Sequence, residues 1–193
     1  SNTAVAGEPG SLVIEGVTWQ GTVIKGDVYN GRVHVQIAAG AGSVAKKLDV
    51  KHYRGGTLGS VVSDLMRETG EKLSSTSDPA VQSHSVSRWT RPLGKGSVAL
   101  QNVANELCLV WRYLRDGTIW LGSDTWTEAK TAHDEINRSP GRDALLIAPE
   151  APHIQPGQTF DGKHVARVVT SIQEGQGLRQ ELQFESAAGG NRI

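Results

Sequence analysis

Residues 22–38 read TVIKGDVYNGRVHVQIA, and this stretch decides the fold class. Two apolar-rich runs flank the dipeptide Asn30-Gly31. That pattern is a strong β-hairpin signal, because a type I′ turn needs positive φ at both central residues. In the second run, Arg32–Ala38, apolar and polar residues alternate. A period of two predicts a strand with one buried and one solvated face.

The same turn chemistry recurs along the chain. Asp116-Gly117 and Asp161-Gly162 each separate two short runs that contain apolar residues. Further strands are predicted at Ala144–Ala148, His164–Ile172 and Leu178–Phe184. The chain has 23 glycines in 193 residues, about 12% against a usual ~7%. This excess fits many tight turns between short strands.

Between residues 57 and 122 the pattern becomes partly helical. Apolar residues in Thr57–Thr69 recur at i, i+3, i+4, i+7 and i+8, with Thr57 as the N-cap and Gly70 just after the last turn. A second amphipathic helix is predicted at about Ser97–Val110. The expected class is therefore α+β, mainly β, with an inserted small helix-containing domain.

These patterns also give a domain division. We expect residues 11–56 and 123–186 to form a mainly β domain and residues 57–122 to form the inserted α+β domain. Residues 1–10 and 187–193 are small, polar or glycine-rich, and we expect flexible tails there. No stretch approaches the ~18 apolar residues of a membrane span, and the first residues lack the features of a secretory signal.

Charge and cysteine content exclude several classes of site. Lys plus Arg and Asp plus Glu are 20 each, so the formal net charge is zero. This balance argues against a dedicated surface for nucleic acid or anionic membrane. The single cysteine, Cys108, excludes an intrachain disulfide and a Cys-built zinc site. Because Cys108 lies in an apolar part of the second predicted helix, we expect a buried, unreactive thiol.

Candidate catalytic and metal-ligating residues are scattered. Ser83, His84 and Asp78 are the residue types of a catalytic triad, but the sequence offers no strained turn or oxyanion hole beside them. His133-Asp134-Glu135 combines possible metal ligands, but adjacent side chains on a helix or strand point apart. A solvated loop is the favoured interpretation there, and no catalytic, cofactor or metal site is predicted.

Two other patterns have alternative interpretations. Gly40-Ala41-Gly42 begins like a dinucleotide-binding loop, but the sequence continues with Lys46-Lys47 where a helix with a further glycine is needed. A loop between strands is therefore favoured. A basic run predicts an exposed strand edge, with a polyanion contact as the alternative. It consists of Lys46, Lys47, Lys51, His52 and Arg54.

The chain contains five tryptophans but only two phenylalanines. We expect most of the tryptophans in the core and one or two as anchors of a subunit interface. They are Trp19, Trp89, Trp111, Trp120 and Trp126.

Three parts of the chain carry a resemblance to one known family. They are Thr57–Gly70, then Val86–Gly94 leading through a second helix to Trp111–Gly122, and last Ile154–Gly162 with His164–Val169 and Leu178–Phe184. The first looks like a helix of phage tail hub proteins that ends in glycine, and the last is similar to the closing β-hairpin of these hubs. The family includes late-control-type baseplate hubs, the Mu hub protein, siphophage tail-tip hubs and type VI secretion spikes. The resemblance covers about residues 12 to 186.

This resemblance implies a structural virion protein and no enzyme. Such hubs contain tube-like β-barrels with an inserted small domain, so the resemblance implies that residues 11–56 and 123–186 form one or more tube-like β-barrels. They are homotrimers whose barrels form a pseudo-hexameric ring between the tail tube and the distal tip. The expected location is the virion tail. Expected partners are a second and third copy, the tail tube, and distal tail and spike or fibre proteins, with the tape measure protein as a further candidate. DNA is expected only to pass through the lumen, and no membrane or cofactor is expected. The chain is shorter than the larger hubs.

Two alternatives remain open from the sequence. One is a carbohydrate- or ligand-binding β module that uses tryptophans as stacking surfaces. The other is a cell-wall hydrolase component that uses a residue such as His84 or His133. For the hub interpretation, we expect subunit contacts at the strand edges of Thr22–Ala38 and at the closing strands, Val165–Phe184.

Overall fold

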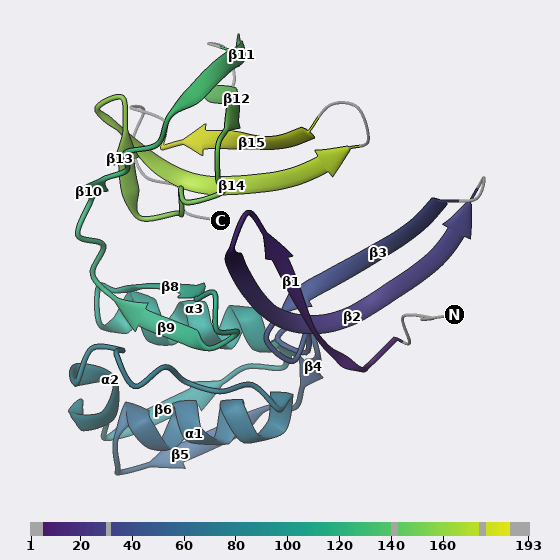
Figure 1. Cartoon of the computed structure of the whole chain (residues 1–193). Coiled ribbons are helices and arrows are strands. Elements are labelled where there is room, and N and C mark those ends of the chain that lie inside the picture. The colour runs from purple at the N-terminus through teal and green to yellow at the C-terminus, as the bar shows by residue number, and fades with distance from the viewer. Residues whose placement is uncertain (1–5, 30–31, 140–142, 174–176, 186–193) are drawn as a thin grey trace. The chain divides into compact units, whose positions relative to one another are not determined.

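The computed structural model describes residues 6–29, 32–139, 143–173 and 177–185 (Figure 1). Strands make up 48% of the chain and helices 16%, which confirms the α+β, mainly β class. The chain forms two compact units. The first contains Ser1–Leu12 and Thr18–Ser123, and the second contains Val13–Val17 and Asp124–Ile193. That residues 11–56 and 123–186 together form one barrel stays a prediction.

The N-terminal sheet has the order β1-β2-β3. Its strands are β1 (Pro9–Ile14), β2 (Val17–Tyr29) and β3 (Arg32–Ala39). Strands β2 and β3 pair antiparallel from Gly21↔Ala39 to Tyr29↔Arg32, with a register shift between Val23 and Lys25. This confirms the strand pair predicted from residues 22–38, whereas the turn residues Asn30-Gly31 lie outside the described residues.

The turn between β1 and β2 was not predicted from the sequence. Its residues are Glu15 and Gly16, with φ of 46° and 74°. Positive φ at both central residues is the geometry of a type I′ turn. Glutamate has no preference for this conformation, so the Glu-Gly pair carried no recognisable turn signal.

After the N-terminal sheet, the described residues of the first unit form three helices and three short strand pairs. The helices are α1 (Leu58–Thr69), α2 (Ala80–Ser83) and α3 (Gly96–Glu106). The antiparallel pairs are β4 (Lys47–Leu48) with β7 (Gly94–Lys95), β5 (Lys51–Arg54) with β6 (Arg88–Arg91), and β8 (Val110–Tyr113) with β9 (Ile119–Gly122).

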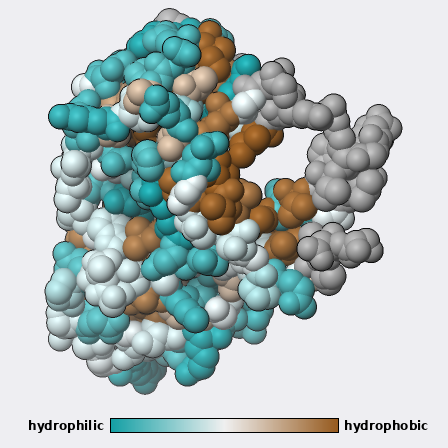
Figure 2. Space-filling model, in the orientation of Figure 1, coloured by the Kyte–Doolittle hydropathy of each residue, from teal (hydrophilic) through white to brown (hydrophobic). Residues whose placement is uncertain are grey.

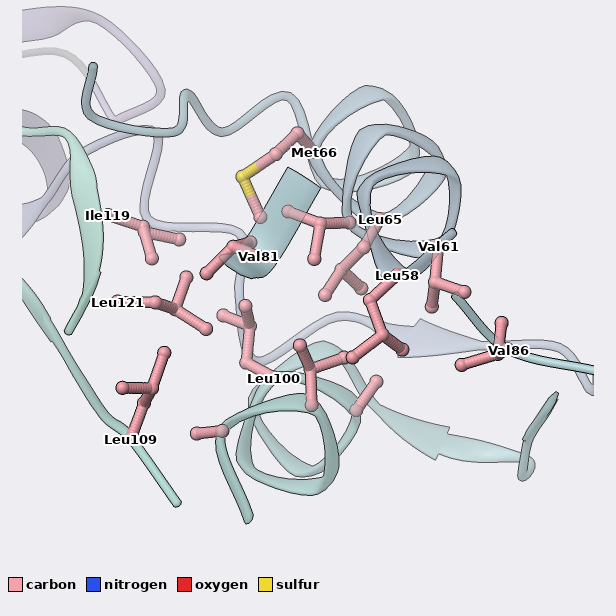
Figure 3. Close-up of a cluster of buried hydrophobic side chains, with 14 of the residues drawn as sticks. Leu58, Val61, Leu65, Met66, Val81, Val86, Leu100, Leu109, Ile119 and Leu121 are labelled. Carbon is pink, nitrogen blue, oxygen red and sulfur yellow. The ribbon is translucent and has the colours of Figure 1, made fainter. Parts of the chain in front are cut away.

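A single hydrophobic cluster holds these elements together (Figure 3). The face of α1 that was predicted from its spacing is the buried one, and it packs with Val81 of α2, Leu100 of α3 and Leu121 of β9. Gly70 ends α1 in the left-handed conformation, as predicted. Thr57 occupies the N-cap position, but its side chain makes no capping hydrogen bond.

The second predicted helix is shorter than its pattern suggested, and Cys108 is exposed. After Glu106, Cys108 adopts a φ of 54°. The N–H of Leu109 donates to Ala104 O at 2.8 Å, and the N–H of Cys108 donates to Asn105 O at 3.2 Å. These two bonds are a Schellman cap. The prediction of a buried thiol was wrong, because the left-handed residue turns out of the helix and Leu109 is buried instead.

Both described Asp-Gly signals turn a hairpin, but in different ways. Asp161 and Gly162 have φ of 51° and 70° between the paired residues Phe160 and Lys163, which is a two-residue type I′ turn. At Asp116-Gly117 only the glycine has positive φ, and the N–H of Gly117 donates to Leu114 O at 3.0 Å. That loop is one residue longer, with the glycine as its left-handed residue.

The second unit is built on a curled, half-barrel sheet with the order β10-β13-β14-β15-β12-β11. Its strands are β10 (Thr127–Glu128), β11 (His133–Ser139), β12 (Ala144–Pro149), β13 (Gln158–Phe160), β14 (Lys163–Gln173) and β15 (Gly177–Phe184). One face carries a second hydrophobic cluster, which includes Leu145, Ile147, Leu182 and Phe184.

His133-Asp134-Glu135 begins strand β11 and is not a loop, which corrects the prediction from the sequence. Strand β11 pairs with β12, and nearly all its side chains are exposed. A polar edge strand of this kind has no apolar alternation, so its sequence resembles that of a loop. Among the described residues, no helix has the length and apolar composition needed to span a membrane.

Candidate functional site

The described residues expose large apolar side chains mainly on strands. Apolar surface is visible in brown in Figure 2. The strand residues are Leu12, Val13, Ile24, Val35, Ile136, Val169 and Ile172. The exposed large apolar side chains outside strands are Val50, Leu93 and Val98. The first four strand residues belong to the N-terminal sheet, and Val169 and Ile172 belong to β14. Contiguous apolar surface marks interaction sites more often than single exposed residues do.

Strand β3 is an open sheet edge. It lies at the end of the order β1-β2-β3, it contains neither lysine nor proline, and Val35 in its middle is 44% exposed. The edge strand β11 is different, because it carries Asp134, Glu135 and Arg138 and has a register shift after Glu135. Charges and bulges protect an edge from pairing, so β3 is the less protected of these two edges.

The basic run is partly neutralised by acidic groups on α1. The Lys51 ammonium forms an ion pair with Asp64 and lies 3.9 Å from the Glu68 carboxylate. Lys46 Nζ donates to the main-chain carbonyl oxygen of Glu68 at 3.0 Å. The hydrogen bond from Lys51 is the main cause that lowers the pKa of Asp64. Burial, followed by the nearby charge of Asp64, raises the pKa of Tyr53 to about 12. These contacts favour a structural role for Lys46 and Lys51 over a polyanion contact.

The sequence candidates for a catalytic triad are not brought together. Ser83 Oγ donates to Pro79 O at 3.1 Å, and Asp78 Oδ1 accepts the N–H of Ala80 at 2.8 Å. Both contacts stabilise α2. His84 Nε2 lies 3.8 Å from Glu106 Oε1, at the end of α3.

The residues around His133 form local contacts within the second unit. His133 Nδ1 lies 3.0 Å from Thr131 O, and its ring meets the edge of Phe160 with centroids 4.9 Å apart. Glu135 pairs with Arg138 on the same strand at 2.7 Å. Among the described residues, no group of three His, Cys, Asp or Glu side chains could hold a metal ion.

All five tryptophans are half-buried, which corrects the expectation that most are in the core. Trp89 and Trp111 pack against the first hydrophobic cluster. The guanidinium of Arg112 lies 4.4 Å from the Trp120 ring centroid. The Trp120 ring also packs on Gly122, where an added Cβ would lie 2.7 Å from the indole Cη2. The remaining two, Trp19 and Trp126, contact Arg115 and His164, respectively.

The best-formed polar constellation in the first unit surrounds the buried carboxylate of Glu71. Glu71 is 5% exposed and accepts the N–H groups of Ala41 at 2.9 Å and Ser43 at 3.0 Å. The Tyr113 hydroxyl donates to the same carboxylate at 2.9 Å. Burial, together with this hydrogen bond and the carboxylate charge, raises the pKa of Tyr113, so the hydroxyl keeps its proton.

No protein-family profile matches the chain, and no curated protein matches it in sequence.

Two features of the first unit stand out, namely the open edge of β3 and the loop that holds the Glu71 carboxylate. The sequence indicated the first of them but not the second. The strands Thr22–Ala38 were expected to make contacts, and they contain the open edge. Gly40-Ala41-Gly42 was weighed from the sequence as the start of a dinucleotide-binding loop and interpreted instead as a loop between strands. In the structure, the N–H groups of Ala41 and Ser43 bind the carboxylate of Glu71 in the same chain. No local signal near position 71 indicated this contact, because it joins segments far apart in the sequence.

Proposed function

We propose that the chain is a non-enzymatic structural subunit of a phage tail-tip or baseplate hub, which assembles as a homotrimeric ring between the tail tube and the distal tip. The observation that carries the proposal is the open edge of β3, with exposed apolar side chains on the strands around it. Backbone N–H and C=O groups along an open edge are satisfied efficiently by another strand.

Ring formation needs two different surfaces on each subunit, because a heterologous contact joins one patch to another on the next copy. The chain offers exposed apolar residues on strands of both units, such as Val35 on β3 and Ile172 on β14. In a ring, each of the two surfaces would be covered by the next copy of the same chain, so no other protein is needed to bury them.

The resemblance to tail hubs supports the same proposal. Its stretches correspond to α1, to the hairpin β8–β9 and to strands β13 to β15. The zero net charge suits a ring through which DNA passes, because affinity for phosphate would slow its transit.

The two alternatives receive less support from the contacts. Trp19, Trp120 and Trp126 each have a contact from Arg or His on the ring, whereas a carbohydrate-stacking platform needs an open ring face. For the hydrolase alternative, His84 lies 3.8 Å from Glu106 of α3, and His133 contacts Thr131 O and the ring of Phe160, so both imidazoles are engaged in local contacts.

The test is the oligomeric state of matched surface variants, measured by light scattering after size-exclusion chromatography. Val35→Lys places a charge on the β3 edge and is expected to turn a trimer into monomers. Leu93→Lys is the matched control, because Leu93 is 58% exposed and lies outside the strands. It is expected to leave the trimer intact. A wild-type monomer, or equal effects of the two variants, would contradict the proposal.

A further inference from the structure

The loop that follows β3 has the geometry of an anion receptor. Gly40 and Gly42 have φ of 63° and 69°, and the N–H groups of Ala41 and Ser43 both point to the Glu71 carboxylate. Successive main-chain N–H groups in such left-handed turns form a concave nest for anions. The loop is closed on its other side by Thr22, whose hydroxyl donates to Gly40 O at 2.8 Å.

Both oxygens of the Glu71 carboxylate are used. Oε2 accepts the N–H of Ala41, while Oε1 accepts the N–H of Ser43 and the hydroxyl of Tyr113. A buried carboxylate is stable only when such donors replace its water shell, and hydrogen bonds to a charged group are about twice as strong as neutral ones. These three donors therefore form a preorganised carboxylate site.

The site is also shaped for its ligand by the absence of a side chain at Gly40. A Cβ there would collide with Glu71 Oε2 and would lie 2.6 Å from Tyr113 Cε1 and 2.8 Å from Gly117 O. Backbone also lies near the Cβ position of Gly117, which would be 3.1 Å from Gln20 O. A side chain at position 40 would therefore take the place of the carboxylate.

We propose that residues 40–43, together with Tyr113, form a binding site for a small carboxylate, in which Glu71 is the resident intramolecular ligand. By occupying this site, Glu71 fixes the loop that leads out of β3 and so positions the β2–β3 hairpin. When the Glu71 side chain is cut back, the site accepts a free carboxylate of the size of formate or acetate.

The experiment is a chemical rescue of Glu71→Ala. This variant leaves the N–H groups of Ala41 and Ser43 and the Tyr113 hydroxyl without their partner, and its melting temperature is expected to fall. Sodium formate or acetate is expected to raise that temperature saturably, by about 3–5 °C at ten times the dissociation constant. Sodium chloride at the same ionic strength is expected to have a much smaller effect.

The matched control is Glu106→Ala, which removes an exposed carboxylate of the same unit. Wild type and Glu106→Ala are expected to respond to formate as they respond to chloride. Rescue of all three proteins to the same extent, or no rescue of Glu71→Ala beyond chloride, would overturn the proposal.

Glu71→Asp gives a second readout if the alanine variant does not fold. Because aspartate is shorter by one methylene, its carboxylate is drawn away from the loop. Hydrogen exchange is then expected to accelerate at the amides of Ala41 and Ser43, but not at the amide of Gln20, which donates to Arg115 O at 2.7 Å. Unchanged exchange at Ala41 and Ser43 would show that the carboxylate does not hold the loop.

Discussion

Gly40 packs so closely against the carboxylate of Glu71 that a Cβ at position 40 would collide with it. The contact joins the end of β3 to the loop after α1, and Tyr113 of β8 completes it. Three segments of the first unit thus meet at one buried charge. The conformation of the β3 exit therefore depends on residues that the local sequence does not reveal.

Gly40→Ala is expected to destabilise the protein by about 3 kcal/mol, since the new methyl group combines a steric clash with an unfavourable positive φ. The measurement is the free energy of unfolding from urea titration.

Substitutions at two other glycines measure the effect of positive φ without the steric clash, and the effect of neither. Gly55 has a φ of 67° with nothing near its Cβ position, so Gly55→Ala is expected to cost only about 1 kcal/mol. Gly94 has open space and no positive φ, and Gly94→Ala is expected to be nearly neutral. Equal costs at positions 40 and 94 would refute the packing of Gly40 on Glu71.

Cys108→Gly is expected to stabilise the protein by about 0.5–1 kcal/mol, because glycine adopts the left-handed C′ conformation without the strain that a side chain brings. Thermal unfolding measures the change. The same site gives a second check: the exposed wild-type thiol is expected to react with a thiol reagent in the native state. A thiol that reacts only after denaturation would show that the sequence-based prediction was right.

The raised pKa of Tyr53 predicts that the protein loses stability at alkaline pH. Its folded pKa is about 12 against a usual 10, so the folded protein retains a proton that the unfolded chain releases. Stability from this group is complete below pH 10 and falls as pH rises toward 12. Near-ultraviolet titration of Tyr53→Phe is expected to lack the phenolate step near pH 12. A titration curve with that step intact would assign the raised pKa to another group.

Leu100→Ala is expected to cost about 2–5 kcal/mol, because Leu100 is fully buried in the first hydrophobic cluster. Leu93→Ala is the control, since Leu93 is exposed, and it is expected to change the free energy of unfolding by less than about 0.5 kcal/mol. A small effect at Leu100 would place it outside a packed core.

Much of the fold was predictable because its signals are local. The spacing of Leu58, Val61 and Leu65 predicted the buried face of α1, and alternation predicted β15. Asp161-Gly162 predicted a hairpin because both residues tolerate positive φ.

The errors arose where tertiary contacts overrule local pattern. The apolar run around Cys108 resembled a continuing helix, yet α3 ends at Glu106 because burial of Leu109 requires the chain to turn. The charged sequence of β11 resembled a loop, although its backbone pairs with β12. The contact between Glu71 and the N–H of Ala41 could not be predicted either, because it joins segments that are 30 residues apart in the sequence.

The most direct test of the proposed function is the native mass of the purified wild-type chain, measured by mass spectrometry under non-denaturing conditions. A ring subunit is expected to give a dominant species at three times the chain mass of 20.6 kDa. A single species at 20.6 kDa, unchanged as the protein concentration rises, would contradict the proposal that this chain assembles into a trimeric hub.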